Sequence, residues 1–284
     1  MKLAVAGKGG AGKTSLAAWL ADWLARAGKD VWLVDADTAL SLGQASGLDR
    51  AALPVPLVRR EDLVQERIGA GLIHLNPDVG DLPEALSAPV PLGGPASPGV
   101  APGRKRLLVM GAVANAGGGC ACAANALLKA LLAHLVLDRS EWVVVDLEAG
   151  VEHLGRGTVM SVDALAVVSE PSRRALETGA EIGRLAAQMG LANQALVLNR
   201  APGGIGPAPG GNERVTGGRD PAAGGVQLPD LPGLPPLAAA IPRLPGLEAR
   251  QLASPSVLGL PESDLLDALC ARLLQRLEQG RRRA

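Results

Sequence analysis

Short apolar runs bounded by turn residues alternate along this chain with segments in which apolar residues recur every three or four positions. The runs are typical of buried strands, and the periodic segments are typical of amphipathic helices. The alternation predicts an α/β fold, with a mostly parallel central β-sheet flanked by helices. Strands are predicted at Lys2–Ala6, Val31–Val34, Arg106–Met110, Trp142–Val145, Ala164–Val168, Ala195–Leu198 and Leu237–Ile241. Helices are predicted at Lys13–Ala27, Ala124–Val136, Arg173–Met189 and Glu262–Gln279.

Two segments rich in Pro and Gly interrupt this pattern, at about 77–103 and 201–236. Both are interpreted as surface excursions. A strand and a closing helix are predicted after the second segment, which favours an insertion over a linker between domains. We therefore expect residues 1–284 to form a single domain.

Residues 7–14 match the pattern G-x-x-x-x-G-K-[ST], between a predicted strand and a predicted helix. Glycines let backbone N–H groups approach phosphate oxygens, and the helix N-terminus adds its positive end. Lys13 is expected to reach the β- and γ-phosphates, and Thr14 is expected to ligate Mg²⁺. The loop predicts ATP binding through Gly7, Lys8, Gly9, Gly10, Ala11, Gly12, Lys13, Thr14 and Ser15.

Polar residues at the ends of later strands extend this site. Asp35 and Asp37 follow the second strand, where carboxylates can hold Mg²⁺-bound water or orient an attacking water. Asp146, Asn199 and Pro242 end three further strands. The carboxyl ends of parallel strands meet at one edge, so these residues are expected to lie beside the phosphate loop.

A pair of cysteines, Cys120 and Cys122, follows three glycines and precedes a predicted helix. A helix N-terminus favours thiolates, and thiolates bind Zn²⁺ or Ni²⁺. A closed site needs four ligands, which a two-fold dimer would supply. A strained redox disulfide and two small buried residues remain alternatives. Cys270 lies among leucines of the last helix and is expected in the core.

The composition of the chain bears on nucleic-acid binding, on membrane insertion and on the cellular compartment of the protein. The chain has 28 basic and 28 acidic residues, so no global field favours nucleic acid. Three cysteines form no disulfide framework and no signal peptide precedes the first strand, which together predict a cytoplasmic protein. No apolar run approaches the ~20 residues of a membrane span. Phe and Tyr are absent, for which the sequence gives no physical reason.

Lys8, directly after the first glycine of the loop, resembles the second lysine of the deviant Walker A ATPases, the class of MinD, ParA and the nitrogenase iron protein. The resemblance implies that Lys8 reaches the nucleotide of a partner subunit; a solvated cation near the phosphates is the alternative. It also implies catalytic roles for Asp37, Lys13 and Lys8.

The same resemblance assigns the remaining strand-end residues. It makes Asp37 the hydrolytic residue of switch I, Asp146 the Walker B carboxylate and Gly150 the glycine of switch II. It implies that Asn199, Arg200 and Pro242 contact the adenine. Thr38 and Ser41 stand where the class usually has Pro and Asn, so nucleotide binding is better supported than hydrolysis.

Three stretches make the resemblance more specific: Glu61–Pro83, Gly118–Leu137 and Asp146–Thr158. They are similar to CooC-type ATPases, the nickel-inserting maturation factors of carbon monoxide dehydrogenase. The resemblance implies a homodimer that holds Ni²⁺ between the Cys120–Cys122 pairs, with Zn²⁺ as a competitor and the apo-enzyme as client. His153, in the stretch after Asp146, is favoured as a structural residue. Ala123 replaces a frequent proline.

Two other functions remain open. A MinD-like or ParA-like positioning ATPase could dock the last helix on lipid through Arg281–Arg283, although Asp264, Asp267 and Glu278 oppose this and favour packing in the core. An iron–sulfur reductase would need a further cysteine shortly after Asp146, and Leu147–Thr158 has none.

Overall fold

The computed structural model describes residues 1–37, 39–69, 77–111, 127, 130, 131, 134, 141–147, 162–202 and 228–281. Within them, eight strands form one sheet in the order β3-β4-β2-β5-β1-β6-β7-β8. The strands are β1 (Lys2–Gly7), β2 (Val31–Ala36), β3 (Ala88–Pro89), β4 (Lys105–Val109), β5 (Trp142–Leu147), β6 (Ala164–Ser169), β7 (Gln194–Ala201) and β8 (Leu237–Pro242). Every pairing is parallel except that of β3 with β4, which confirms the predicted fold class.

The described helices lie mostly between the strands in sequence. They are α1 (Lys13–Arg26), α2 (Leu42–Ala45), α3 (Glu61–Ile68), α4 (Leu82–Leu86), α7 (Arg173–Gln188), α8 (Pro245–Gln251) and α9 (Ser263–Arg281). Two short 3₁₀ helices, Arg50–Ala52 and Leu57–Arg59, connect α2 to α3. Of the helix predicted at Ala124–Val136, residues 127, 130, 131 and 134 are described, and each is helical.

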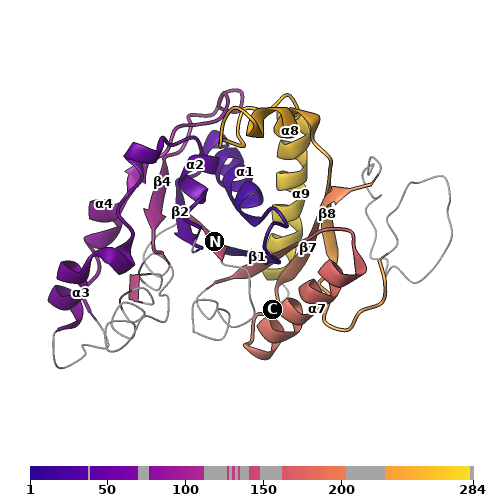
Figure 1. The fold of residues 1–284 in the computed structure, drawn as a ribbon, viewed down its shortest axis with the longest axis horizontal. Coiled ribbons are helices and arrows are strands. Elements are labelled where there is room, and N and C mark those ends of the chain that lie inside the picture. Colours follow the sequence, from indigo (N-terminus) through magenta and orange to yellow (C-terminus); the bar gives the residue numbers. More distant parts are fainter. Residues whose placement is uncertain are drawn as a thin grey trace.

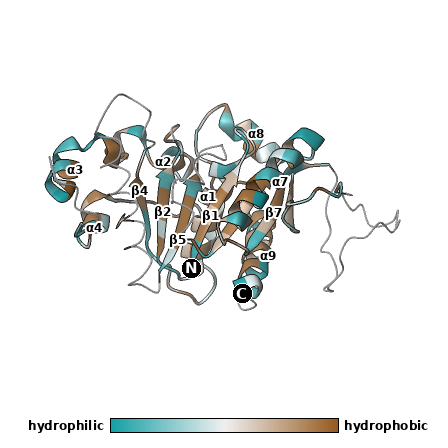
Figure 2. Ribbon diagram, turned by 90° about the horizontal axis from the view of Figure 1, so that it is seen from below, coloured by the Kyte–Doolittle hydropathy of each residue, from teal (hydrophilic) through white to brown (hydrophobic). Residues whose placement is uncertain are grey.

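Helices cover the sheet on both faces and create two apolar cores (Figure 1). α1, α2 and α9 pack on one face, against side chains such as Leu3 and Val5 of β1. α3, α7 and residues 127 and 131 pack on the other face, against Ala4 and Ala6. Successive residues of β1 therefore face opposite cores, and the central strands are apolar along their length (Figure 2).

The last helix belongs to the first of these cores. Leu266, Cys270, Leu273, Leu274 and Leu277 of α9 are buried there. This confirms the prediction that α9 packs in the core and that Cys270 is a core residue.

The segment 77–103 is more than the surface excursion that its proline and glycine content predicts. Val79, Leu82 and Val90 are buried, and the segment contains α4 and the edge strand β3. Pro83 occupies the first turn of α4, where a missing N–H costs nothing, and Pro89 lies in an edge strand. Because these prolines occupy the few positions that regular structure tolerates, the first part of the segment packs into the fold, whereas none of residues 91–103 is buried.

Candidate functional site

The parallel sheet brings the carboxyl ends of β1, β2, β5, β7 and β8 to one edge. The phosphate loop follows β1, which lies between β5 and β6 in the sheet. Strands β2 to β5 lie on one side of β1, and β6 to β8 lie on the other, so the strand order reverses at β1. Ligands of open α/β sheets bind at such a reversal of strand order. The loop therefore lies where the topology favours a ligand.

The loop itself has the backbone of a phosphate cradle. The N–H of Ala11 donates to the carbonyl oxygen of Lys8 at 3.1 Å, which closes a tight turn. Gly12 precedes α1 with φ of 102°, a conformation that glycine adopts without strain. The first turn of α1 carries no acidic side chain, so its free N–H groups and positive end are available to an anion.

The two lysines of the loop lie in different environments. The Lys13 side chain is only 5% exposed, and its Nζ lies 4.0 Å from Oδ2 of Asp37. Lys8 is exposed at the surface of the loop. Lys13 is thus placed toward the strand-end carboxylates of its own chain, and Lys8 is placed toward solvent.

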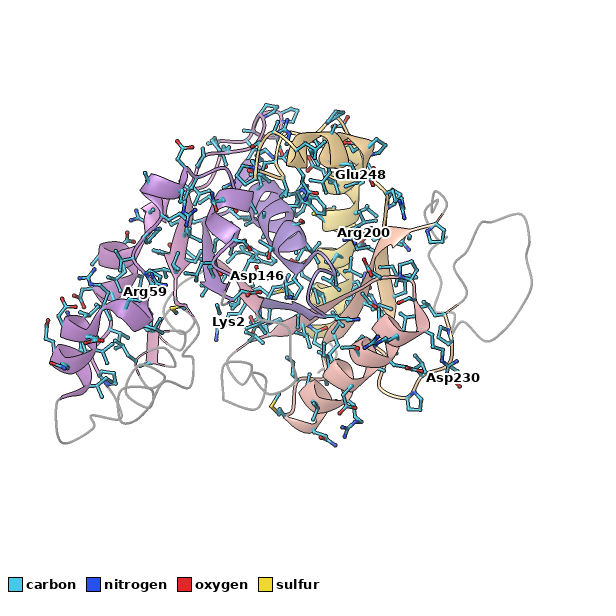
Figure 3. All side chains as sticks on the ribbon, in the orientation of Figure 1. Lys2, Arg59, Asp146, Arg200, Asp230 and Glu248 are labelled. Atoms are coloured by element: carbon cyan, nitrogen blue, oxygen red, sulfur yellow. The ribbon has the colours of Figure 1, made fainter. Side chains whose placement is uncertain are left out.

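Asp146, at the end of β5, is the most deeply buried acid of the site and lies near the centre of the molecule (Figure 3). Its Oδ2 accepts a hydrogen bond of 2.6 Å from the Thr14 hydroxyl, and its Oδ1 has no hydrogen-bond partner among the described residues. Burial raises the pKa of Asp146 to about 7, an effect that the Thr14 hydrogen bond reduces and neighbouring Asp35 increases.

Asp35 is opposite Asp146 in the register of β2 and β5. Burial raises the pKa of Asp35 to about 6, against the effect of two backbone hydrogen bonds. Its Oδ2 accepts from the N–H of Leu42 at 3.0 Å, and its Oδ1 accepts from the N–H of Asp37 at 3.3 Å. Asp35 therefore fixes the start of α2 and the backbone of Asp37, a role that the sequence analysis missed.

These residues fit a magnesium ion. A hydroxyl and carboxylates are the hard oxygen ligands that Mg²⁺ prefers, alongside nucleotide phosphates and water. Oδ1 of Asp146 is a buried acceptor with no partner in the described part of the chain, and a metal-bound water can satisfy it. Thr14 and Asp146 would hold the ion, and Asp35 is opposite Asp146 on the neighbouring strand.

Three residues expected to contact adenine come from neighbouring strands on one side of the loop. Asn199 Nδ2 donates to the Ala11 carbonyl oxygen at 2.8 Å. Arg200, labelled in Figure 3, forms an ion pair with Glu170, which follows β6. Pro242, the last residue of β8, is in register with Ala201. Glu170 was not predicted as a site residue, because its sequence signal is limited to its position directly after an apolar strand.

Several predicted site residues lie outside the described residues: Thr38, Cys120, Cys122, Ala123, Gly150 and His153. Within the described part of the chain, no group of three or more His, Cys, Asp or Glu residues is arranged to hold a metal ion. In the same part, no helix is both long enough and apolar enough to cross a bilayer.

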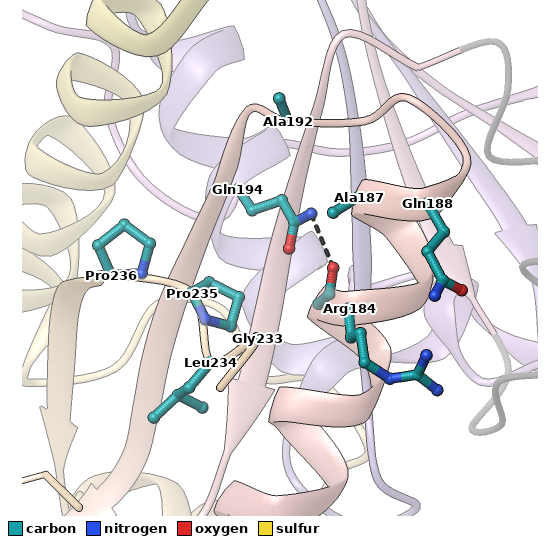
Figure 4. A pocket seen from close by; sticks show the side chains of 10 residues that line it. Arg184, Ala187, Gln188, Ala192, Gln194, Gly233, Leu234, Pro235 and Pro236 are labelled. Carbon is teal, nitrogen blue, oxygen red and sulfur yellow. Dashed lines mark hydrogen bonds between the residues drawn. The ribbon is translucent and has the colours of Figure 1, made fainter. Parts of the chain in front are cut away.

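A separate hollow of about 540 Å³ lies between α7 and residues 233–236 (Figure 4). Leu234, Pro235 and Pro236 line one side, and Arg184 and Gln188 line the other. Gln194 is the first residue of β7 and Pro236 directly precedes β8, so the hollow is at the edge of the sheet opposite the phosphate loop. It is not part of the nucleotide site.

Comparison with known proteins places this site in a family. Residues 2–207 match the model of the CobQ/CobB/MinD/ParA nucleotide binding domain, and the chain belongs to that family of P-loop proteins. By its sequence it is a nucleotide-binding P-loop protein of the MinD/ParA class, and its fold agrees with that class.

Within the family, the chain is 38% identical over 207 residues to the carbon monoxide dehydrogenase accessory protein CooC of Rhodospirillum rubrum. The matched region covers 70% of this chain and 74% of that protein. It is 37% identical over 206 residues to an uncharacterised ATP-binding protein of Methanocaldococcus jannaschii, covering 70% and 75%. The cell division ATPase MinD of Pyrococcus furiosus has the same fold, with a TM-score of 0.62 and 23% identity over 98% of each chain.

Proposed function

We propose that this protein is an ATP-dependent metallochaperone that binds nickel between two copies of the chain and aids nickel insertion into carbon monoxide dehydrogenase. The observation that carries the proposal is the 38% identity to CooC, which is named as an accessory protein of that enzyme. The site geometry supports the nucleotide half of the proposal, through the phosphate loop and the carboxylates beside it.

Cys120 and Cys122 are the proposed nickel ligands. Each chain supplies two thiolates, and a square-planar or tetrahedral thiolate site takes four. A two-fold dimer presents the pair twice and completes the set. Nickel is the cargo of this site, and Zn²⁺ competes for the same thiolates.

The exposed position of Lys8 supports a dimer with the two loops facing each other. Lys13 is buried beside Asp37 of its own chain, whereas Lys8 is exposed to solvent. A cation at the loop surface can reach phosphates of a nucleotide bound to a second copy. One association then serves both the cysteine pair and the nucleotide.

Hydrolysis of ATP to ADP and phosphate is assigned to the same edge of the sheet. Asp37 orients the attacking water, and Lys13 and Lys8 neutralise the charge that develops on the transferred phosphoryl group. Mg²⁺, when bound at Thr14 and Asp146, adds positive charge to the phosphates. The hydrogen bonds of Asp35 to Asp37 and Leu42 hold switch I close to Lys13.

The packing of α9 disfavours the rival function of a membrane-docking positioning ATPase. Such docking needs the leucines of α9 at the surface, and Leu266, Leu273, Leu274 and Leu277 are buried against α1 and β8. Co-sedimentation with anionic liposomes separates the two functions, because the metallochaperone stays in the supernatant with and without ATP.

The proposed function is tested by activation of nickel-free carbon monoxide dehydrogenase. Nickel-loaded protein with MgATP should restore carbon monoxide oxidation at nickel concentrations where free Ni²⁺ does not. Asp37→Asn should bind ATP but give little activation, and Cys270→Ala, which changes a buried thiol away from the site, should behave as wild type. Equal activation by free Ni²⁺ and by the loaded protein would contradict the proposal.

A further inference from the structure

The phosphate loop accepts a hydrogen bond from the side chain of Asn199, which is 188 positions away from Ala11 in sequence. We propose that Asn199 is a positioning residue of this loop, which fixes the Ala11–Gly12 peptide and so aims the loop at phosphate whether or not a base is present. The inference rests on the nucleotide-binding part of the proposed function and adds to the adenine contact expected of Asn199.

The first observation is an irregularity at the end of β7. The register of β7 against β8 shifts between Leu198 and Ala201, so Asn199 and Arg200 form a bulge. Arg200 has φ of 56°, a left-handed conformation that is uncommon for a residue with a side chain. Bulges change the direction of a side chain at a sheet end, and they are frequent beside functional sites.

Two contacts hold the bulge in this form. The Arg200 guanidinium forms an ion pair with Glu170, directly after β6. The backbone N–H of Arg200 donates to Oδ1 of Asn199 at 3.0 Å. The bulge is thus tied to β6, and β6 pairs with β1 up to Gly7, where the loop begins.

The orientation of the Asn199 amide follows from its partners. The Arg200 N–H is a donor and can face only the amide oxygen, so the amide nitrogen must face the other way. There Nδ2 donates to the Ala11 carbonyl oxygen at 2.8 Å, and Ala11 is only 2% exposed. Each end of the amide has one partner that fixes it.

The loop is built to receive this side chain. A Cβ at Gly12 would lie 2.3 Å from Nδ2 of Asn199, so the amide occupies the space that any larger residue would need. Gly12 is therefore required for its contact with Asn199 as well as for its φ of 102°. Since Gly12 directly precedes Lys13 and α1, Asn199 sets the direction from which the loop N–H groups and Lys13 meet a phosphate chain.

The test uses inorganic tripolyphosphate, which has phosphates but no base. Its affinity and that of ADP are measured by calorimetry with Mg²⁺ for wild type, Asn199→Ala and the nearly isosteric Asn199→Leu. We expect both variants to bind tripolyphosphate about five- to tenfold more weakly, as for a lost hydrogen bond that orders a binding loop, and ADP by at least the same factor.

Asn193→Ala is the matched control. Asn193 directly precedes β7, at the end away from Asn199, and its Nδ2 donates to the carbonyl oxygens of Leu277 at 2.9 Å and Asp163 at 3.3 Å. This variant loses comparable hydrogen bonds and stability, measured by thermal melting, but should keep wild-type affinity for tripolyphosphate.

The outcomes separate the two claims. Unchanged tripolyphosphate affinity in Asn199→Ala and Asn199→Leu, with weaker ADP binding, would overturn the positioning role and leave only a base contact. An equal loss in Asn193→Ala would also overturn it, because general destabilisation would then explain the effect. A wild-type protein that binds neither ADP nor ATP would contradict the proposed function itself.

Discussion

The hydroxyl of Thr14 donates a 2.6 Å hydrogen bond to Oδ2 of Asp146, and so joins the first turn of α1 to the end of β5. One residue follows the phosphate loop and the other ends β5, 132 positions later in sequence. The contact sets the distance between the two elements that share Mg²⁺ and the phosphates under the proposed function.

Thr14→Ala should therefore weaken nucleotide binding in a manner that depends on Mg²⁺. The variant loses a magnesium ligand and leaves Asp146 without its donor, which should raise the pKa of that carboxyl further. We expect calorimetry to show ADP affinity about tenfold or more lower with Mg²⁺, and little changed with EDTA. Thr14→Ser keeps the hydroxyl and serves as the control. An equal loss in both media would count against a role at the metal.

The buried carboxylates predict a pH dependence of stability for the nucleotide-free protein. The pKa values of Asp35 and Asp146, about 6 and about 7, lie above the ordinary value of 3.8. The folded state thus holds more protons than the unfolded state between about pH 4 and 7, so the free energy of unfolding falls as the pH rises through that window. Each group contributes up to about 1.4 kcal/mol per pH unit.

Asp146→Asn removes one of these titrating groups and should make the free energy of unfolding depend less steeply on pH. Thermal melting in EDTA from pH 5 to 8 should show a higher melting temperature than wild type at pH 8 and a smaller difference at pH 5. The same slope in both proteins would show that Asp146 does not titrate in this range.

A buried ion pair away from the site predicts a large effect on stability alone. Lys105 Nζ lies 2.6 Å from Oδ1 of Asp22, with side chains 0% and 5% exposed. Burial opposes the ionisation of Asp22, but Lys105 and other hydrogen-bond donors hold the pKa of Asp22 below its usual value. Lys105→Met removes the cation and should lower the free energy of unfolding by about 3 kcal/mol, without changing ADP affinity.

Arg104→Gln is the comparison for that variant. Arg104 pairs with Asp30 at 2.8 Å, but its side chain is 63% exposed. Loss of such a surface pair should cost less than about 1 kcal/mol in urea unfolding. Equal costs for the two variants would contradict the assignment of the Lys105 pair as a core interaction.

The exposed position of Lys8 predicts that a substitution there affects dimerisation more than ATP binding. Lys8→Ala should bind ATP to each protomer with a modest loss of affinity, since Lys13 and the loop backbone remain. It should fail to form the ATP-dependent dimer in light scattering. Dimers of Lys8→Ala as stable as those of wild type would assign Lys8 to the surface of its own chain.

Much of the fold could be predicted because its elements have strong periodicity. The parallel strands and α1, α7 and α9 agree with prediction within a few residues, and the loop between β1 and α1 follows from its glycines and lysine. Short elements such as α2, α3 and α8 were missed, since a few residues carry too little periodicity. Tertiary packing and local hydrogen bonds, such as that from Leu42 to Asp35, define them instead.

The positions of the candidate site residues at the strand ends were predictable, whereas their contacts were not. The strand-end positions of Asp35, Asp146 and Asn199 follow from the sequence, because parallel strands align their carboxyl ends. The bulge at Arg200 does not, since its left-handed backbone depends on an ion pair with Glu170, 30 residues away. Long-range pairs of this kind leave no periodic signal.

The central claim is a nickel site made by two copies of the chain, and its most direct test is a Ni²⁺ titration of the metal-free protein. Thiolate-to-metal absorption and molar mass by light scattering are followed with ADP, with ATP and without nucleotide, for wild type, Cys120→Ala and Cys270→Ala. The account predicts one Ni²⁺ per dimer in wild type and in Cys270→Ala, and none in Cys120→Ala. Dimerisation with ATP but no stoichiometric nickel would contradict the metallochaperone and favour the positioning ATPase.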